Sequence, residues 1–250
     1  MTNKYMYFIA NWKMFGDIKS LNSLDKVIKF LKIQKNNKFK LIYCPPHTLL
    51  NLFFNKLKKS KIDIGGQNCH HIESNGPHTG QINSKMLKDV GAKYVIIGHS
   101  ENRTEGDSDY LINKKIKSCL NNGLKVIFCF GETLIQRKKN LTHKVLTNQI
   151  NKGIQDVNKL NNILFAYEPV WAIGSGSVPK NENLKKDISF IKKTLKSKYR
   201  LKNPIVLYGG SVNSKNIKIL KEINVIDGFL VGGSSQNPNK FIDIVKKTFI

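Results

Sequence analysis

Eight short apolar runs alternate with longer amphipathic segments along the chain of 250 residues, and this alternation restricts the fold more than any other feature. The runs are of strand length and rich in Ile, Val, Phe and Tyr. They cover residues 5–10, 40–44, 62–65, 94–98, 125–130, 163–167, 205–208 and 228–231. Between them, apolar residues recur at helical spacing, as in Leu184, Ile188, Ile191 and Leu195.

Strands that are apolar on both faces and are each followed by a helix indicate a parallel sheet covered by helices. Eight such units without a long linker or a break in composition predict one α/β domain over 1–250, a closed (β/α)8 TIM barrel. A doubly wound open sheet is the alternative. That fold needs a glycine-rich phosphate fingerprint after the first strand, where this chain has Asn11-Trp12-Lys13 instead.

The chain is strongly basic, with 42 Lys and Arg against 17 Asp and Glu and a formal net charge of +25. The basic residues are spread over nearly every polar segment, together with many Asn and Ile, which share A/T-rich codons with Lys. We therefore interpret the charge as a bias of the genome and expect no nucleic-acid partner. The positive field still favours an anionic substrate.

The remaining composition predicts an intracellular, cytoplasmic protein. The N-terminus lacks the layout of a signal peptide, and no apolar run approaches the ~20 residues that span a bilayer. Cys44, Cys69, Cys119 and Cys129 have neither CxxC nor zinc spacing, so we expect no disulfide and no metal.

In a barrel of this kind the functional site lies at the carboxyl ends of the strands. One lysine, one histidine and one glutamate meet there, namely Lys13, His99 and Glu168. Glu168 ends an apolar strand, and Pro169 with a glycine loop follows it. Burial raises the pKa of a carboxyl, and a closing loop excludes water. This stretch therefore predicts a base under a lid, although a surface Glu–Lys pair would fit the stretch on its own.

Glycine pairs follow the last two strands, in Gly209-Gly210-Ser211 and Gly232-Gly233-Ser234. Without side chains, their backbone N–H groups can approach an anion closely. Phosphate sites of such barrels lie at these two strand ends. The pattern predicts a phosphate site there, with Gly174 of the lid as a further donor.

These residues resemble the triosephosphate isomerase family from Asn11 to the last helix. The matching motifs are NWKM at 11–14, GHSEN at 98–102, AYEPVWAIGSG at 166–176, YGGSV at 208–212 and DGFLVGG at 227–233. The resemblance implies interconversion of dihydroxyacetone phosphate and D-glyceraldehyde 3-phosphate through an enediolate, in glycolysis and gluconeogenesis. It also implies that no cofactor or metal takes part and that the protein is a homodimer.

The resemblance also implies the residue roles. Glu168 would be the base that removes the carbon-bound proton, and His99 the neutral electrophile that polarises the substrate oxygens. Lys13 would supply fixed positive charge, Asn11 a nearby donor, and Glu101 a contact to Lys13. The residues expected to hold the phosphate, under a lid from Pro169 to Ser177, are Gly174, Ser211, Gly232 and Gly233.

Some positions depart from the family pattern. Asn102 replaces the usual Arg and Gln81 the usual acid, so we expect these two amides to meet across the dimer interface. That interface is expected in the loop that begins at Cys69 and ends at Thr79. The far hinge of the lid, Ser177-Val178-Pro179, is also unusual, and we expect the lid kinetics to differ from those of the family.

The histidines of the 69–79 segment and the two tryptophans also have expected places. His70, His71 and His78 are expected to serve packing of the interface loop rather than a metal site. Trp12 is expected beneath the site, and Trp171 in the lid hinge.

Another phosphate-binding barrel enzyme, a lyase or an epimerase, is the alternative activity. A Schiff-base lyase needs a lysine inside the barrel, and a metal-dependent epimerase needs His and Asp ligands on several strand ends. A basic, non-catalytic binding protein would not require Glu168, His99 and Lys13 on one rim.

Overall fold

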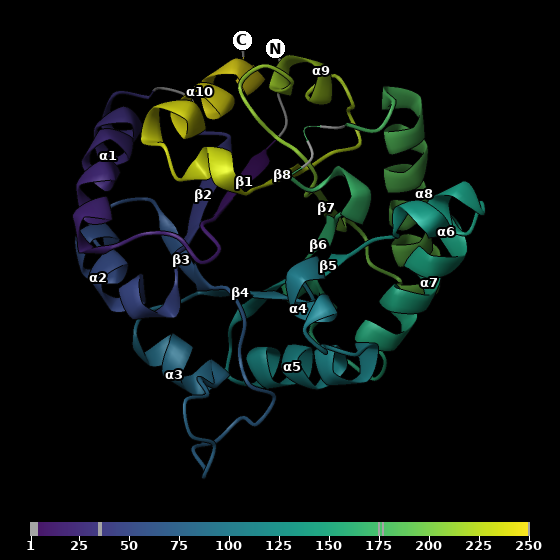
Figure 1. Cartoon of the computed structure of the whole chain (residues 1–250), viewed down its shortest axis with the longest axis horizontal. Coiled ribbons are helices and arrows are strands. Elements are labelled where there is room, and N and C mark those ends of the chain that lie inside the picture. The colour runs from purple at the N-terminus through teal and green to yellow at the C-terminus, as the bar shows by residue number, and fades with distance from the viewer. Residues whose placement is uncertain (1–4, 35–36, 175, 177, 250) are drawn as a thin grey trace.

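The computed structural model describes residues 5–34, 37–174, 176 and 178–249, and eight parallel strands of these residues close into a barrel (Figure 1). Each strand pairs with the next in sequence, and β8 pairs with β1. The strands are β1 Met6–Asn11, β2 Phe39–Cys44, β3 Asp63–Gly66, β4 Tyr94–Ile97, β5 Lys125–Phe130, β6 Ile163–Tyr167, β7 Ile205–Tyr208 and β8 Gly228–Val231. The predicted closed barrel is confirmed, and the open sheet is wrong.

Helices surround the barrel and cover its outer face (Figure 1). They are α1 Ser23–Ile33, α2 His47–Leu57, α3 Ser84–Asp89, α4 Ser100–Thr104, α5 Asp109–Asn121, α6 Leu134–Lys138, α7 Thr142–Gly153, α8 Asn181–Tyr199, α9 Ile217–Leu220 and α10 Pro238–Phe249. Short 3-10 turns are η1 Ile18–Asn22, η2 Leu160–Asn162, η3 Val170–Ala172 and η4 Gly233–Ser235. The segments with apolar residues at helical spacing thus form helices, with their apolar faces toward the strands.

Two apolar layers stabilise this arrangement. One fills the barrel interior, with Leu164 and Ala166 of β6 among its members. The other lies between strands and helices and includes Phe165 and Tyr167 of the same strand. Successive side chains of a strand point to opposite faces. Both faces of each strand are therefore buried, which explains why the strands appear in the sequence as continuous apolar runs.

The predicted boundaries shift by a residue at several strands, and the end of β4 has a clear physical reason. Gly98 has φ +77°, a left-handed conformation that leaves the strand, so β4 ends at Ile97. A Cβ at Gly98 would lie 2.9 Å from the carbonyl oxygen of Cys129. The turn directs the chain into α4 directly after His99. Asn11, expected just past the first strand, is the last residue of β1.

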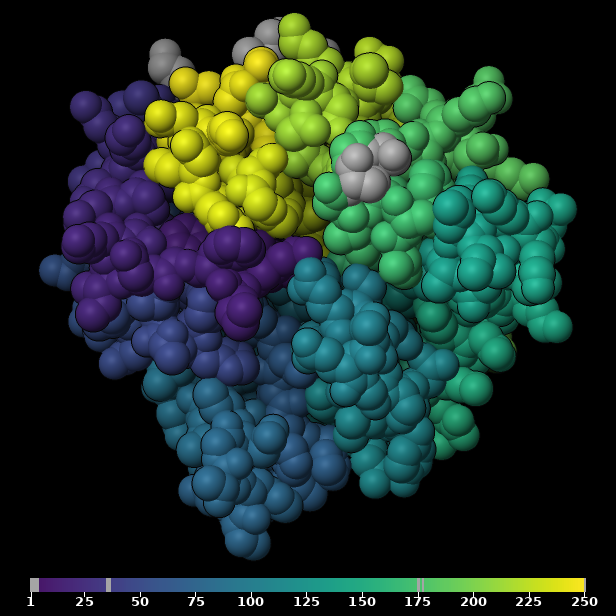
Figure 2. Space-filling view, viewed as in Figure 1, coloured from purple at the N-terminus to yellow at the C-terminus, as the bar shows by residue number. Residues whose placement is uncertain are grey.

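A long loop between β3 and α3 protrudes from the barrel and contains the 69–79 segment (Figures 1 and 2). Only one β-bridge, His70 with Asn83, is formed in this loop among the described residues. Asn83 also caps α3, since its side chain accepts a hydrogen bond from the backbone N–H of Met86 at 2.8 Å. The base of the loop is thus fixed, while its tip extends beyond the barrel.

Candidate active site

A cavity of about 290 Å³ opens at the carboxyl ends of the strands. Its lining includes the predicted site residues Asn11, Lys13, His99, Glu168, Gly174, Ser211, Gly232 and Gly233. Glu101 is the one predicted residue outside the lining, and it contacts Lys13. The closed barrel therefore brings to one rim residues that lie far apart in the sequence.

Glu168 continues the inward face of β6, two residues after Ala166. Its side chain is almost fully buried, and its carboxylate makes no strong hydrogen bond among the described residues, although Nε2 of His99 lies 3.4 Å from Oε1. Burial raises the pKa of this carboxyl, and the neighbouring His99 offsets only part of that effect. A desolvated carboxylate is a stronger base than an exposed one.

Gly209 makes room for this side chain. A Cβ at Gly209 would lie 2.7 Å from Cγ of Glu168, closer than any van der Waals contact. The Gly209 N–H donates to the carbonyl oxygen of Tyr167 at 2.8 Å. Gly210 packs so tightly against the Tyr208 ring that a Cβ there would meet its hydroxyl. Both glycines therefore have a packing role, and both also line the cavity, where the approach of an anion stays a prediction.

His99 faces Glu168 across the cavity, with 3.4 Å between Nε2 and Oε1 of the carboxylate. Its other ring nitrogen, Nδ1, accepts a hydrogen bond from the backbone N–H of Glu101 at 3.3 Å, at the start of α4. This contact favours the tautomer that has its proton on Nε2, although Nδ1 also lies 3.5 Å from Oε2 of Glu101. The Nε2 side of His99 thus faces the cavity and Glu168.

Lys13 directs its ammonium group to Glu101, with Nζ 2.5 Å from Oε1. Lys13 has φ +56°, an unfavourable conformation for a residue with a side chain. The side-chain oxygen of Asn11 accepts the Lys13 backbone N–H at 3.1 Å and supports this turn. Strained backbone of this kind is concentrated at functional sites. Trp12 points away from the cavity, is buried, and donates to the Ser235 carbonyl at 3.2 Å.

One end of the cavity is formed by the loops that follow β7 and β8 and by the lid. Backbone groups and the Ser211 hydroxyl line this end. The Ser211 hydroxyl accepts the Gly176 N–H at 3.1 Å, and the Ser211 N–H donates to the Ala172 carbonyl at 3.0 Å. A Cβ at Gly233 would meet no atom within 4 Å, so there is open space beside its backbone. Such a surface suits an anion that needs several donors at close range.

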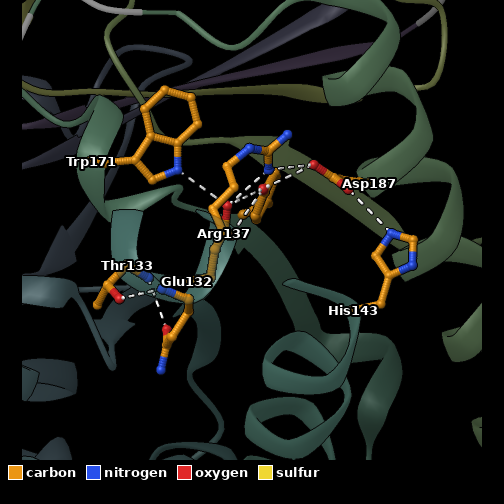
Figure 3. Close-up of polar contacts among 8 residues, drawn as sticks. Glu132, Thr133, Arg137, His143, Trp171 and Asp187 are labelled. Carbon is orange, nitrogen blue, oxygen red and sulfur yellow. Dashed lines mark hydrogen bonds and ion pairs between the residues drawn. The ribbon is translucent and has the colours of Figure 1, made fainter. Parts of the chain in front are cut away.

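The near hinge of the lid rests on a buried polar cluster (Figure 3). Trp171 Nε1 donates to Oε1 of Glu132 at 3.2 Å, as expected for a hinge residue. Arg137 bridges Glu132 and Asp187, with Nη1 at 2.9 and 3.0 Å from their oxygens. Sequence reasoning missed Arg137 and Asp187, because they lie on helices 50 residues apart. At the far hinge, Ser177 lies outside the described residues, and Pro179 is buried.

A larger cavity of about 710 Å³ lies at the base of the protruding loop and is lined by both Gln81 and Asn102. The His70 ring packs against the tilted rings of His71 and His78, with centroids 4.4 and 4.6 Å apart. Among the described residues, no group of three or more His, Cys, Asp and Glu is arranged to hold a metal ion. This region is separate from the rim that carries Glu168.

Comparison with known proteins agrees with the fold. The family model described as triosephosphate isomerase matches residues 6–248. A triosephosphate isomerase of Thermodesulfovibrio yellowstonii is 41% identical over 244 residues, covering 96% of this chain and 98% of the relative. One of Bartonella bacilliformis is 37% identical over 248 residues, covering 98% and 97%.

A solved structure supports the same assignment. The crystal structure of triosephosphate isomerase from Bartonella henselae has a TM-score of 0.89 and 35% identity, and the match covers 97% of this chain and 98% of that one. Sequence and structure agree over nearly the full length. The chain therefore belongs to the triosephosphate isomerase family, whose reaction interconverts dihydroxyacetone phosphate and glyceraldehyde 3-phosphate.

Proposed function

We propose that this chain catalyses the family reaction with Glu168 as the base and His99 as the electrophile. The observation that supports this best is the buried Glu168 carboxylate that faces Nε2 of His99 at 3.4 Å. Glu168 removes the proton from the carbon beside the carbonyl and returns it to the neighbouring carbon. His99 donates to the substrate oxygens as negative charge develops on them, which stabilises the enediolate.

Lys13, Asn11 and Glu101 complete the polar side of the site. The ammonium group of Lys13 stabilises the anionic substrate and the enediolate. Glu101 orients Lys13 by their short ion pair, and the Glu101 N–H favours the tautomer of His99 that has its proton on Nε2. Asn11 supports the turn that places Lys13 and donates from its side-chain amide.

The phosphate group is held at the opposite end by the backbone of Gly232 and Gly233, by Ser211, and by Gly174 when the lid is closed. A closed lid excludes water and prevents the enediolate from eliminating phosphate. Closure also strengthens the interaction of the fixed donors with the developing charge, since water no longer screens them.

A lyase or an epimerase on the same barrel is the second candidate. A Schiff-base lyase needs a reactive amine inside the barrel, whereas Lys13 follows β1 and its ammonium is paired with Glu101. A coupled assay with glyceraldehyde 3-phosphate distinguishes these activities. We expect wild-type turnover that disappears in Glu168→Gln. Pure, folded wild-type protein without isomerase turnover would refute the proposal.

We further propose a homodimer formed through the loop from Cys69 to Thr79. The loop protrudes from the barrel (Figure 2), and the cavity of about 710 Å³ lies at its base. Gln81 and Asn102 line that cavity, and we expect them to bond across the interface. An exposed or half-exposed pair contributes only ~1 kcal/mol, so the dimer tolerates their neutral side chains. Sedimentation that gives only monomer at micromolar concentration would contradict this.

The reaction is expected in the cytoplasm, as a step of glycolysis and gluconeogenesis. No helix in the described part of the chain is long and apolar enough to cross a membrane. We expect the positive net charge to attract the anionic substrate. We expect no binding of nucleic acid. A gel-shift experiment with labelled RNA at physiological salt tests that expectation. We expect the protein to leave the mobility of the RNA unchanged.

A further inference from the structure

The buried cluster below the lid connects three elements of the barrel wall (Figure 3). Glu132 follows β5, Arg137 lies on α6, and Asp187 lies on α8. Both carboxylates are almost completely buried, and the single guanidinium bonds to each at 2.9 and 3.0 Å. The Tyr167 hydroxyl lies 3.1–3.3 Å from oxygens of both carboxylates and has one proton to donate. The positions of the two carboxylates, the guanidinium and the Tyr167 hydroxyl therefore depend on one another.

The cluster holds the near hinge of the lid at two points. Trp171 donates from Nε1 to the Glu132 carboxylate, and the Val170 N–H donates to the Glu132 backbone carbonyl at 3.0 Å. The guanidinium of Arg137 also lies 5.3 Å from the centre of the Trp171 ring, close enough for a cation–π contact. The position of the hinge indole thus depends on where Arg137 is held.

The same cluster reaches the far hinge through α8. Val178 packs on the core and Pro179 is buried, and α8 begins at Asn181 immediately after them. Asp187 lies about two turns into this helix, and an α-helix of that length is rigid. Any movement of the far hinge that displaces the start of α8 therefore displaces Asp187 and its bonds to Arg137.

The negative charge of Asp187 helps to hold the guanidinium of Arg137 in place. Burial lowers the pKa of the Arg137 guanidinium, but its bonds to Asp187 and Glu132 outweigh this and raise the pKa above its ordinary value. Arg137 therefore remains charged and bonded to both. The other oxygen of Asp187 lies 3.2 Å from Nε2 of His143, which fixes the carboxylate from the α7 side.

We propose that Asp187 and Arg137 are positioning residues that couple the two hinges, so that the lid opens and closes as one unit. Neither residue lines the active-site cavity. They act by keeping the hinge indole and the start of α8 in a fixed relation, and this role rests on the proposed function of the lid. Without the coupling, the near hinge closes independently of the far hinge, and the enediolate is exposed to water more often.

The test compares Asp187→Asn with Asp227→Asn as a matched control. Like Asp187, Asp227 is buried and pairs with a basic residue, in this case Lys192 of α8, whose Nζ lies 2.6 Å from Oδ2 of Asp227. None of the bonds that the structure shows for Asp227 reaches the lid hinge. Three quantities are measured: kcat and KM, the inorganic phosphate released per isomerisation, and the fluorescence of Trp171. In the release, the C–O bond to phosphate breaks, its electron pair leaves with the phosphate, and methylglyoxal remains.

The chain has 2 Trp, so a Trp12→Phe background leaves Trp171 as the sole indole reporter. The probe is 2-phosphoglycolate, a stable anion with a phosphate dianion and a carboxylate that resembles the enediolate. We expect Asp187→Asn to lower kcat about threefold to tenfold with a smaller change in KM, and to raise phosphate release by a similar factor. The Trp171 fluorescence change on binding the probe should shrink. Asp227→Asn should alter thermal stability without these effects.

Equal phosphate release and equal Trp171 signals in Asp187→Asn and Asp227→Asn would overturn the coupling, even if both variants are less stable. If Asp187→Asn does not fold, Arg137→Lys decides in the same assays. It keeps the charge but loses the planar group that bridges both carboxylates. Phosphate release and Trp171 fluorescence equal to those of the wild type in Arg137→Lys would also overturn the inference. Failure of the proposed function is distinct, because wild-type protein would then not turn over the triose phosphate.

Discussion

Gly209→Ala is a small change that acts directly on Glu168, the proposed base. The residue follows β7 and faces the barrel interior, where its Cα lies beside the Glu168 side chain. An added Cβ would lie 2.7 Å from Cγ, 3.2 Å from Oε1 and 3.4 Å from Cδ of Glu168. Gly209 does not have a positive φ, so alanine fits the backbone and the side-chain collision is the main effect.

The expected magnitude follows from these distances. Carbon atoms in contact are separated by about 3.5–4.0 Å, so Cγ of Glu168 must move by about 1 Å. The carboxylate is surrounded by packed residues and moves with Cγ. A displacement of 1 Å in a reacting group lowers the rate by about 10²-fold, which corresponds to about 2.7 kcal/mol in the activation free energy. We expect that loss mainly in kcat.

A coupled assay measures kcat and KM of Gly209→Ala, and a double-mutant cycle identifies the cause. In a Glu168→Ala background the collision is absent, so Gly209→Ala should have little further effect. An unchanged kcat in Gly209→Ala, with the thermal unfolding also unchanged, would refute the steric argument. A full 10²-fold loss that persists in the Glu168→Ala background would show that Gly209 acts through another group.

Three further predictions concern charge. Burial raises the pKa of Glu168 above its ordinary value of 4.5, so the folded protein binds this proton more tightly than the unfolded chain. The Glu168 carboxyl therefore destabilises the fold as pH rises through its folded pKa, and Glu168→Gln should raise Tm at neutral pH but not below about pH 4. Activity of the wild type should fall as pH drops through the same pKa. The value of kcat/KM should decrease with ionic strength, because the net charge is +25 and the substrate is a dianion, and a flat profile would mean that the field has no role. Lys115 is buried and bonds to Asp107 at 2.7 and 2.8 Å, so Lys115→Met should destabilise the protein by about 3–5 kcal/mol in urea unfolding; a loss below ~1 kcal/mol would contradict a buried pair.

Most of the fold follows from local sequence patterns. The four runs at 125–130, 163–167, 205–208 and 228–231 coincide with β5 to β8, because apolar residues on both strand faces have no other place in a helix-covered barrel. The boundaries that shifted are set by backbone details. At the end of β4 the left-handed Gly98 determines where the strand ends, and periodicity contains no signal for that.

The candidate site was predictable in its residue types but not in its supporting contacts. Motifs at strand ends identified Lys13, His99 and Glu168, because barrel topology brings strand ends together. The packing role of Gly209 was not visible, since it depends on the direction of the Glu168 side chain across two strands. A glycine pair after a strand has the same appearance whether it binds an anion or leaves room for a neighbour.

The sequence by itself therefore determined the order of the strands and helices, the closed barrel and the set of groups on its rim. Those properties depend on periodicity and on residues close in the chain. Only the tertiary structure decided that Glu168 is buried opposite His99 and that Arg137 joins Glu132 to Asp187. Desolvation and bridging depend on atoms from distant segments, and these meet only when the barrel is closed.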